Sequence, residues 1–376
     1  MLKLIVTEHE KGLLSFLLED GRTMRLSLSK AEGEASFGDI FRARVQTVNK
    51  GLHCAFLEIG GGQTAYLNTG AQSVKPGQEL TVQITQESYG TKLPTISSEI
   101  SLPGELVVLT DEPGSLAFSR RAEFDGYQRE LLHEQLLPLM ENNGFILRTA
   151  AEKAEPEAIE REAAQLAARF AALRQKAEHS PAPALIEAGQ PIWLEWLQGL
   201  NKADLEEVIT DVPAVHEQLS DYFVRCGLPS EKLRLYQDPM LGLKQLYSAE
   251  KRIAEATGRK VWLDSGAYLI LDRTEAMTVI DVNSGKDDKA ARSAQAAEDI
   301  NREAAREIAR QLQLRNISGM IAVDFINMTR AGAQAELMAY MRSLTGSDPV
   351  YVKVLDITAL GLMELTRRRI RRPLGF

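Results

Sequence analysis

Two aspartates that each interrupt an apolar run are the first candidates for chemistry in this sequence. Asp281 lies in the run at 274–285, and Asp324 lies in the run at 320–325. β-Branched and apolar residues dominate both runs, so each predicts a strand. An ionised carboxylate is costly to bury in a strand unless it is paired, hydrogen-bonded or bound to a cation. The two aspartates are therefore predicted to share one function.

The residues around Asp281 indicate which chemistry this would be. Side chains alternate along a strand, so Glu275, Asp281 and Asn283 are expected on one face. Asn283 is expected just past the carboxyl end of the strand, where open α/β sheets bind ligands. Carboxylate and carboxamide oxygens favour Mg²⁺ or Mn²⁺, with water and a substrate phosphate completing the coordination. The alternative is structural, with each aspartate capping a helix or pairing with an arginine.

The segment between the aspartates predicts the element that connects them. Ile300, Ala304, Ile308 and Leu312 repeat at helical spacing. Strand, helix and strand form a βαβ unit, in which the two strands lie parallel. The two aspartates are thus expected on parallel strands of one sheet.

These segments resemble the catalytic core of the ribonuclease E/G family, bacterial endoribonucleases that cut single-stranded RNA. The resemblance is most specific in TEAMTVIDVNSG at 274–285, and it includes VWL at 261–263 and VDFINM at 323–328. It extends, unevenly, from about Met1 to about Arg369.

The resemblance implies a metal site and bears on assembly. Asp281 and Asp324 would hold one Mg²⁺, with Mn²⁺ as the alternative, and Asn283 would support a carboxylate. Typical members continue into a paired-cysteine motif that binds zinc between subunits, and then into a small dimerisation domain. This sequence ends at Phe376 without these features, so neither zinc nor a zinc-linked dimer is expected. The oligomeric state is left open.

Composition is typical of a soluble globular protein, because 44% of the 376 residues are hydrophobic and 26% are charged. Cys54 and Cys226 lack CxxC spacing, which argues against a disulfide framework and a zinc site. No window approaches the roughly 18 apolar residues of a membrane span, so the cytoplasm is expected and a membrane is not. The net charge of −8 favours an ordinary metabolic enzyme, but five arginines in the six positions after Thr366 predict local positive charge.

Strand and turn patterns, interpreted with the resemblance, predict a mixed α+β fold of five parts. Three short strands open the chain, and a later segment is expected to complete their sheet. Five or so short strands after about residue 37 predict a small barrel of OB-fold type. The family's subdomains correspond to an RNase H-like subdomain at 1–36 and 184–258, an OB-fold RNA-binding domain at 37–101, a 5′-sensor-like segment at 102–183, and a DNase I-like α/β catalytic subdomain at 259–376.

Two aromatic residues of the predicted barrel are candidates for RNA contact. Phe56 and Tyr66 flank the glycine turn at 60–62, where their rings could stack on bases, and Lys92 is available to a phosphate. The alternative is that both rings belong to the barrel core. The family has aromatics and a lysine at the matching positions and uses them on RNA, so the resemblance favours RNA contact.

A second phosphate site is predicted where a strand ends at Arg148 and Thr149. A guanidinium and a hydroxyl there can grip a terminal phosphate, and the alternative is an arginine paired with an acid on the adjacent helix. In the family this region is the 5′ sensor, and the resemblance adds Gly104 and Val108 to a 5′-monophosphate pocket. A basic family residue from the catalytic segment is replaced here by Tyr351, so only weak dependence on the 5′ end is expected.

Together these features predict a Mg²⁺-dependent endoribonuclease of RNA processing or decay, in which metal-activated water attacks the phosphodiester of single-stranded RNA. One alternative is a non-catalytic RNA-binding protein on the same fold. Retention of both aspartates and the asparagine argues against it, because an inactive enzyme has no use for costly carboxylates in strands. The other alternative is a small-molecule phosphohydrolase with an incidental OB-fold, which would have no affinity for RNA.

Overall fold

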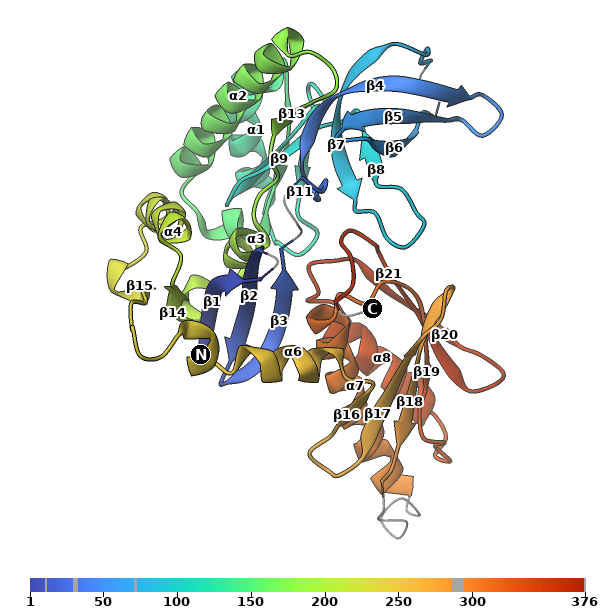
Figure 1. The fold of residues 1–376 in the computed structure, drawn as a ribbon. Coiled ribbons are helices and arrows are strands. Elements are labelled where there is room, and N and C mark those ends of the chain that lie inside the picture. The colour runs from blue at the N-terminus through green and yellow to red at the C-terminus, as the bar shows by residue number, and fades with distance from the viewer. Residues whose placement is uncertain (11, 30–32, 71–72, 286–293, 375–376) are drawn as a thin grey trace. The chain divides into compact units, whose positions relative to one another are not determined.

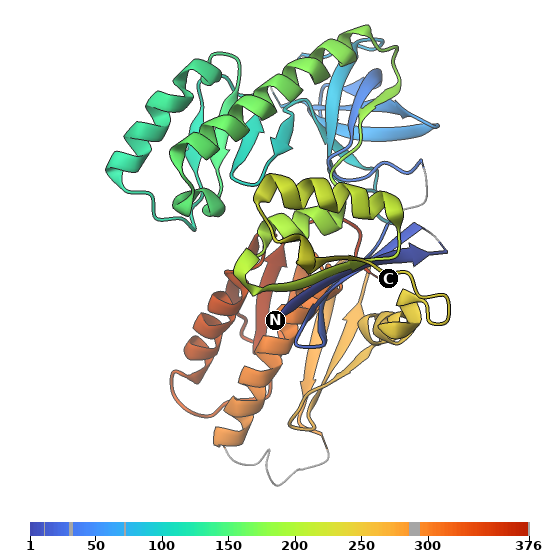
Figure 2. The ribbon, with the colours of Figure 1, turned by 90° about the vertical axis from the view of Figure 1, so that its left-hand side faces the viewer.

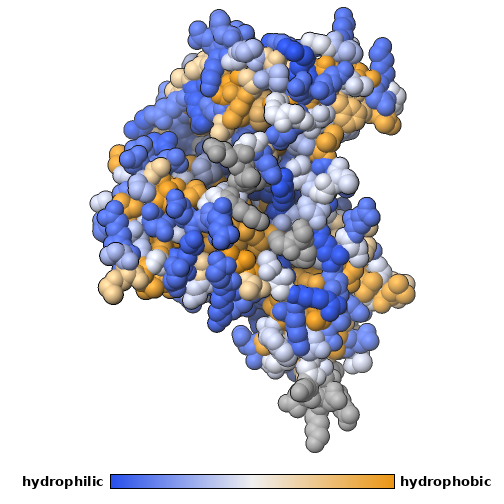
Figure 3. Space-filling view, viewed as in Figure 1, coloured by the Kyte–Doolittle hydropathy of each residue, from blue (hydrophilic) through white to orange (hydrophobic). Residues whose placement is uncertain are grey.

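The computed structural model describes residues 1–10, 12–29, 33–70, 73–285 and 294–374 (Figure 1). Strands and helices both contribute to the fold, which confirms the mixed α+β class. None of the helices in this described part is long and apolar enough to cross a membrane. Hydrophilic side chains cover most of the visible face, and apolar side chains are scattered among them (Figure 3).

The chain divides into two compact units. The first combines Met1–Glu32 with Ile192–Phe376, and the second is Gly33–Pro191. The second unit is therefore an insertion into the first.

The first unit contains a five-stranded sheet. Its strands are β1 (Leu2–His9), β2 (Gly12–Glu19), β3 (Arg22–Leu28), β14 (Leu205–Thr210) and β15 (Leu233–Leu235), in the order β15-β14-β1-β2-β3. Positive φ angles at Asp20 and Gly21 close the hairpin between β2 and β3, as an Asp-Gly pair predicts. β1 pairs in parallel with β14, with Val6 opposite Thr210. The expectation that a later segment completes the opening strands is thus confirmed.

Short helices pack with this sheet. They are α3 (Ile192–Gly199), α4 (Pro213–Cys226), α5 (Leu243–Leu246) and α6 (Ala249–Thr257), with the 3-10 turns η2 (Lys202–Asp204) and η3 (Ser230–Lys232). The helical segment 243–257 is divided between α5 and α6. Ser248 interrupts it because this residue adopts a left-handed conformation, with φ 51°.

A six-stranded sheet follows within the same unit. Its strands are β16 (Lys260–Trp262), β17 (Tyr268–Arg273), β18 (Met277–Asn283), β19 (Gly319–Asp324), β20 (Val352–Ile357) and β21 (Leu362–Arg367), in the order β16-β17-β18-β19-β21-β20. Two helices, α7 (Ala294–Leu314) and α8 (Ala333–Thr345), lie side by side on one face (Figure 2). Ile280, Ile308 and Val323 belong to the core between them. β18 and β19 are parallel and joined through α7, which confirms the predicted βαβ unit.

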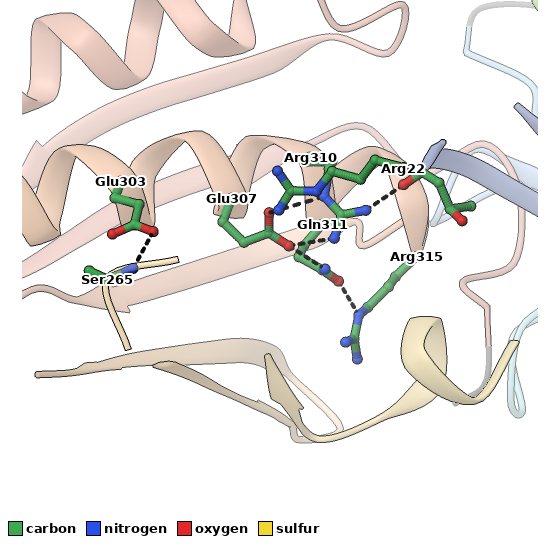
Figure 4. Close-up of polar contacts among 8 residues, drawn as sticks. Arg22, Ser265, Glu303, Glu307, Arg310, Gln311 and Arg315 are labelled. Carbon is green, nitrogen blue, oxygen red and sulfur yellow. Dashed lines mark hydrogen bonds and ion pairs between the residues drawn. The ribbon is translucent and has the colours of Figure 1, made fainter. Parts of the chain in front are cut away.

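A buried polar network connects α7 with β3 (Figure 4). Glu307 accepts hydrogen bonds from Arg22 at 2.5 Å, Arg310 at 2.6 Å and Gln311 at 2.7 Å. Gln311 in turn accepts a hydrogen bond from Arg315, which is fully buried. Desolvation lowers the pKa of Arg315 to about 10. The hydrogen bond from Arg22 therefore joins β3 to α7 through a buried carboxylate.

The arginine run after Thr366 is less available than its composition predicts. Arg367 is 4% exposed and pairs with the buried Asp348 at 2.9 Å. Arg371 pairs with Glu195 at 2.5 Å. These two side chains hold the fold together instead of adding to surface charge, whereas Arg368 and Arg372 of the same run are exposed. The expected local positive charge therefore rests on fewer arginines than the run contains.

The second unit contains a closed barrel. Its strands are β4 (Ile40–Asn49), β5 (Cys54–Gly60), β6 (Gln63–Asn68), β7 (Glu79–Gln86) and β8 (Thr95–Ser97), closed by pairing of β4 with β7. This confirms the OB-like barrel. β13 (Ala184–Glu187) pairs with the edge of β4. Residues 184–191, assigned from sequence to the RNase H-like subdomain, thus lie with the second unit.

A small α+β segment completes the second unit. Its sheet consists of β9 (Ser101–Pro103), β10 (Val107–Thr110), β11 (Leu116–Phe118) and β12 (Gly144–Leu147), in the order β11-β12-β10-β9. Two helices, α1 (Gly126–Met140) and α2 (Pro156–His179), pack with it, and the 3-10 turn η1 (Thr149–Lys153) follows β12 (Figure 1). α2 begins at Pro156, whose fixed φ suits the first helical position, and packs Ile159 and Phe170 into the core.

Candidate active site

The two aspartates singled out from sequence lie directly opposite each other. Asp281 of β18 pairs in register with Asp324, the last residue of β19. Neighbouring strands are about 4.8 Å apart, so the two carboxylates leave the sheet side by side. Their side chains are on the face opposite to the buried Ile280 and Val323, because side chains alternate along a strand.

Asn283 completes this arrangement. Its Nδ2 donates a hydrogen bond to Oδ2 of Asp281 at 2.7 Å. Asn283 is the last residue of β18, whereas the sequence placed it just past the strand end. Its amide holds the Asp281 carboxylate in one orientation. Among the described residues, Asp324 has no hydrogen-bond or ion-pair partner for its carboxylate. Within that part of the chain, therefore, neither aspartate pairs with an arginine.

Two expectations about this site are corrected. The aspartates are exposed, not buried within apolar strands. The apolar residues beside them face α7 and α8, so the cost of burying a carboxylate does not arise. Glu275 does not share their strand face, because β17 ends at Arg273 and β18 begins at Met277. Glu275 lies in the turn between these strands.

Asn301 is a site residue that sequence reasoning missed. It is fully buried in α7, where its Nδ2 donates to the Ile326 carbonyl at 2.7 Å. Its Oδ1 accepts from the Ile326 backbone N–H at 3.0 Å. Both bonds fix the chain two residues after Asp324. In the sequence, Asn301 could have been noticed as a carboxamide directly after Ile300, beside the apolar stripe of the predicted helix.

The donor set fits a hydrated Mg²⁺ or Mn²⁺. Within the described residues, no cluster of three or more His, Cys, Asp or Glu side chains could enclose a metal. Mg²⁺ does not require such a cluster, because it keeps several waters and is bound through one or two carboxylates plus substrate phosphate. Two exposed carboxylates on an open sheet face, one of them oriented by Asn283, meet this requirement.

The barrel places its predicted RNA-binding residues on its outer surface. Phe56 and Tyr66 pair directly across β5 and β6, with ring centroids 6.1 Å apart at 68°. Both are half-buried, and the alternating residues Ala55 and Leu57 form the core instead. Lys92 is exposed in the turn that precedes β8, the strand paired with β6. The alternative that both rings belong to the barrel core is therefore wrong.

The predicted 5′-phosphate residues lie near one another in the second unit. The Arg148 guanidinium donates to the Gly104 carbonyl, and Thr149 Oγ1 is 2.9 Å from Ser119 Oγ. Val108 lies in β10 opposite Pro103, the neighbour of Gly104. These contacts bring all four predicted residues to one end of the small sheet.

Glu162 of α2 explains why position 104 is a glycine. A Cβ there would lie 1.8 Å from Glu162 Oε1. This carboxylate accepts a hydrogen bond from the Leu106 backbone N–H at 3.1 Å, and burial raises the pKa of Glu162.

Tyr351, predicted to replace a basic residue of the family's 5′-phosphate site, is exposed in the first unit.

Comparison with known proteins identifies the class to which this fold and site belong. Residues 101–370, more than half of the chain, match the Ribonuclease E/G family. The chain therefore belongs to the ribonuclease E/G family, which confirms the resemblance seen in its sequence.

Individual relatives align with nearly the whole of this chain. The chain is 30% identical over 400 residues to ribonuclease E of Escherichia coli (strain K12), covering 100% of this chain and 37% of that protein. It is 28% identical over 384 residues to ribonuclease G of the same strain, covering 95% of this chain and 78% of that protein. A putative ribonuclease E of Buchnera aphidicola subsp. Baizongia pistaciae is 30% identical over 401 residues, covering 100% of this chain and 97% of that protein.

Proposed function

We propose that this protein is an endoribonuclease that cleaves single-stranded RNA with a Mg²⁺ or Mn²⁺ ion held by Asp281 and Asp324. The observation that carries the proposal is the register of β18 and β19, which sets the two carboxylates opposite each other. Its relatives are named ribonuclease E and ribonuclease G, which supports RNA as the substrate.

The proposed mechanism follows from which carboxylate oxygens of Asp281 and Asp324 can bind the ion. Asn283 donates to one oxygen of Asp281, and this leaves the other oxygen and the Asp324 carboxylate for the ion. When bound, such an ion supplies activation of the attacking water and stabilises the charge that develops on the phosphate. The exposed sheet face gives the phosphodiester and the water room to approach the carboxylates.

RNA contacts are proposed at two places in the second unit. Phe56 and Tyr66 would stack on unpaired bases, and Lys92 would contact a phosphate. At the small sheet, Gly104, Val108, Arg148 and Thr149 would bind a 5′-monophosphate.

We further propose that the five-stranded sheet is the RNase H-like subdomain and that the six-stranded sheet with α7 and α8 is the DNase I-like catalytic subdomain. Strand orders β15-β14-β1-β2-β3 and β16-β17-β18-β19-β21-β20 support this proposal. In this assignment the OB-fold and the 5′ sensor are consecutive insertions into the first subdomain.

The test uses an end-labelled, unstructured RNA incubated with the protein and Mg²⁺, Mn²⁺ or chelator. Asp281→Asn and Asp324→Asn should each reduce cleavage at least about a hundredfold, because each removes a charged ligand without changing volume. Asp272→Asn is the matched control, since Asp272 is exposed on the same face of the neighbouring strand and pairs with Arg259. It should cleave like the unmodified protein.

Near-normal cleavage by Asp281→Asn or Asp324→Asn would rule out this active site. Tight RNA binding without cleavage under any metal condition would instead support a non-catalytic RNA-binding protein. Circular dichroism and thermal unfolding of each variant confirm that the fold is intact.

A further inference from the structure

An aromatic and basic cluster lies on the same open sheet face as the metal carboxylates. It consists of Lys260 and Trp262 on β16 and Tyr268 on β17, and the sheet order here is β16-β17-β18 (Figure 1). Trp262 is 62% exposed, an unusual degree for a tryptophan. Lys260 is exposed as well.

The strand register connects this cluster to the candidate active site. Trp262 pairs with Tyr268, and Tyr268 pairs with Asn283. Two residues earlier on β16, Lys260 pairs with Ile270 of β17, and Ile270 pairs with Asp281 of β18. Two strand spacings, about 10 Å in all, therefore separate Lys260 from Asp281 and Trp262 from Asn283. Asp324 lies one strand further along the sheet.

The contacts within the cluster fix its geometry. The ring centroids of Trp262 and Tyr268 are 5.2 Å apart and the ring planes are inclined at 63°, so the two rings form an open corner. The Lys260 ammonium occupies this corner, 3.7 Å from the Trp262 ring centroid and 3.6 Å from that of Tyr268. Cation–π attraction holds the charge in place before any ligand arrives. Within the described residues Lys260 has no carboxylate partner, so its charge remains available.

We propose that Lys260, Trp262 and Tyr268 form a nucleotide subsite that adjoins the cleavage site, an inference that rests on the proposed function. The solvent-facing side of Trp262 stacks on one unpaired base of the RNA, and Lys260 contacts a phosphate of that strand. Base–aromatic stacking tolerates any base, and a lysine recognises phosphate as a point charge. The subsite thus holds the substrate near the scissile phosphate without selecting a sequence.

A protein partner on this patch is a less suitable occupant. It would extend from Trp262 toward Asn283 and Asp281 and would cover the face that the substrate must reach. RNA uses the ammonium and the exposed ring together, and it reaches the carboxylates from the same side.

The tryptophan content of the chain allows a direct test. Its other tryptophans, Trp193 and Trp196, are only 2% and 8% exposed. An unstructured RNA oligonucleotide is titrated into the Asp281→Asn protein, which is expected to bind without cutting. Binding should quench the fluorescence of the exposed tryptophan, and adding Trp262→Phe should abolish this quenching. Anisotropy of a labelled oligonucleotide measures binding in parallel.

Kinetics of the otherwise unmodified protein provide the second readout. Trp262→Ala should raise KM for RNA cleavage about 5- to 150-fold, the range for one lost base stack, with kcat within about twofold. Trp262→Phe should retain part of the affinity because it keeps an aromatic face. Lys260→Met should raise KM and lower the salt dependence of binding by about one phosphate contact. Tyr127→Ala is the matched control, because it removes an exposed aromatic side chain that lies in the second unit, away from this patch in the sequence. It should change neither KM nor the salt dependence of binding.

The outcomes separate the two proposals. RNA binding without quenching, or an unchanged KM for Trp262→Ala, overturns the subsite and leaves the endoribonuclease proposal intact. Quenching by RNA, combined with failure of the unmodified protein to cleave that RNA under any metal condition, supports the subsite and overturns the catalytic proposal. A changed molecular mass in light scattering of Trp262→Ala, with unchanged KM, assigns the patch to a protein partner. Absence of any RNA binding overturns both.

Discussion

At the scale of single residues, the candidate site depends on how two carboxylates are oriented. Asn283 orients Asp281 directly through its amide. Asn301 acts one step further away, because it holds both backbone groups of Ile326 near Asp324. A buried carboxamide with both groups satisfied is a rigid support, since leaving either backbone group unpaired costs about 1 to 3 kcal/mol.

Asn301→Ala should therefore shift Asp324 as well as lower stability. We expect a loss of about 2 kcal/mol in the free energy of unfolding, measured by urea denaturation. We also expect the Mg²⁺ concentration for half-maximal cleavage to rise several-fold, which a purely structural loss would not cause. Asn301→Asp, which still accepts from Ile326 but cannot donate, should be intermediate. An unchanged Mg²⁺ response would show that Asn301 supports the fold alone.

At the scale of elements, α7 serves both the site and the core of the first unit. Its apolar stripe packs on the six-stranded sheet, and its polar residues reach β3 through Glu307. Removing one partner from a buried ionic network costs more than the network contributes, because charged groups then remain buried and uncompensated.

Glu307→Ala is expected to lower the free energy of unfolding by about 3 to 5 kcal/mol, because Arg22, Arg310 and Gln311 lose their acceptor. The control is Glu303→Ala, one turn earlier in α7, where among the described residues the carboxylate accepts only the Ser265 N–H at 3.2 Å (Figure 4). That change should cost less than about 1 kcal/mol. Equal losses in chemical denaturation of the two variants would contradict the assigned role of the network.

The strand pair of the barrel makes a separate prediction. Phe56→Ala combined with Tyr66→Ala should weaken RNA binding by about 1 to 3 kcal/mol for each lost stack, measured by fluorescence anisotropy. Little loss of thermal stability is expected, because neither ring belongs to the barrel core. Leu57→Ala is the opposite control, since its side chain is fully buried and should affect stability more than binding. Normal RNA binding by the double variant would reject the stacking role.

At the scale of the whole molecule, the proposed metal site and the proposed 5′-phosphate site belong to different units. The aspartates lie in the first unit, and Arg148 and Thr149 lie in the second. A dependence of cleavage on the 5′ end would therefore be a coupling between units.

We expect this coupling to be weak. Loss of one cation from a phosphate clamp removes a charge-assisted hydrogen bond of about 1.5 to 3 kcal/mol, and Tyr351 stands where the family resemblance places that cation. Cleavage of a 5′-monophosphate RNA should thus exceed that of its 5′-hydroxyl form by less than about tenfold. Arg148→Ala should remove the remaining difference. A much larger preference in the unmodified protein would mean that another residue replaces the missing charge.

Local sequence patterns were enough to predict the chemistry that neighbouring residues carry. Apolar periodicity predicted the strand, helix and strand around the two aspartates, because alternation and helical spacing are properties of neighbouring residues. The Asp-Gly hairpin, the Pro156 helix start and the position of Asn283 were predictable for the same reason. The family resemblance, carried by 274–285, was likewise local.

Only the tertiary structure decided which of these residues meet. Register placed Asp281 opposite Asp324, and packing of α7 exposed both carboxylates instead of burying them. The contact of Asn301 with Ile326 and the row from Trp262 to Asn283 likewise depend on pairing between segments that no local pattern specifies. Burial of Arg367 against Asp348 removed a charge that the sequence seemed to offer for RNA. Strand register and burial arise from packing between distant parts of the chain, so composition and spacing alone do not determine them.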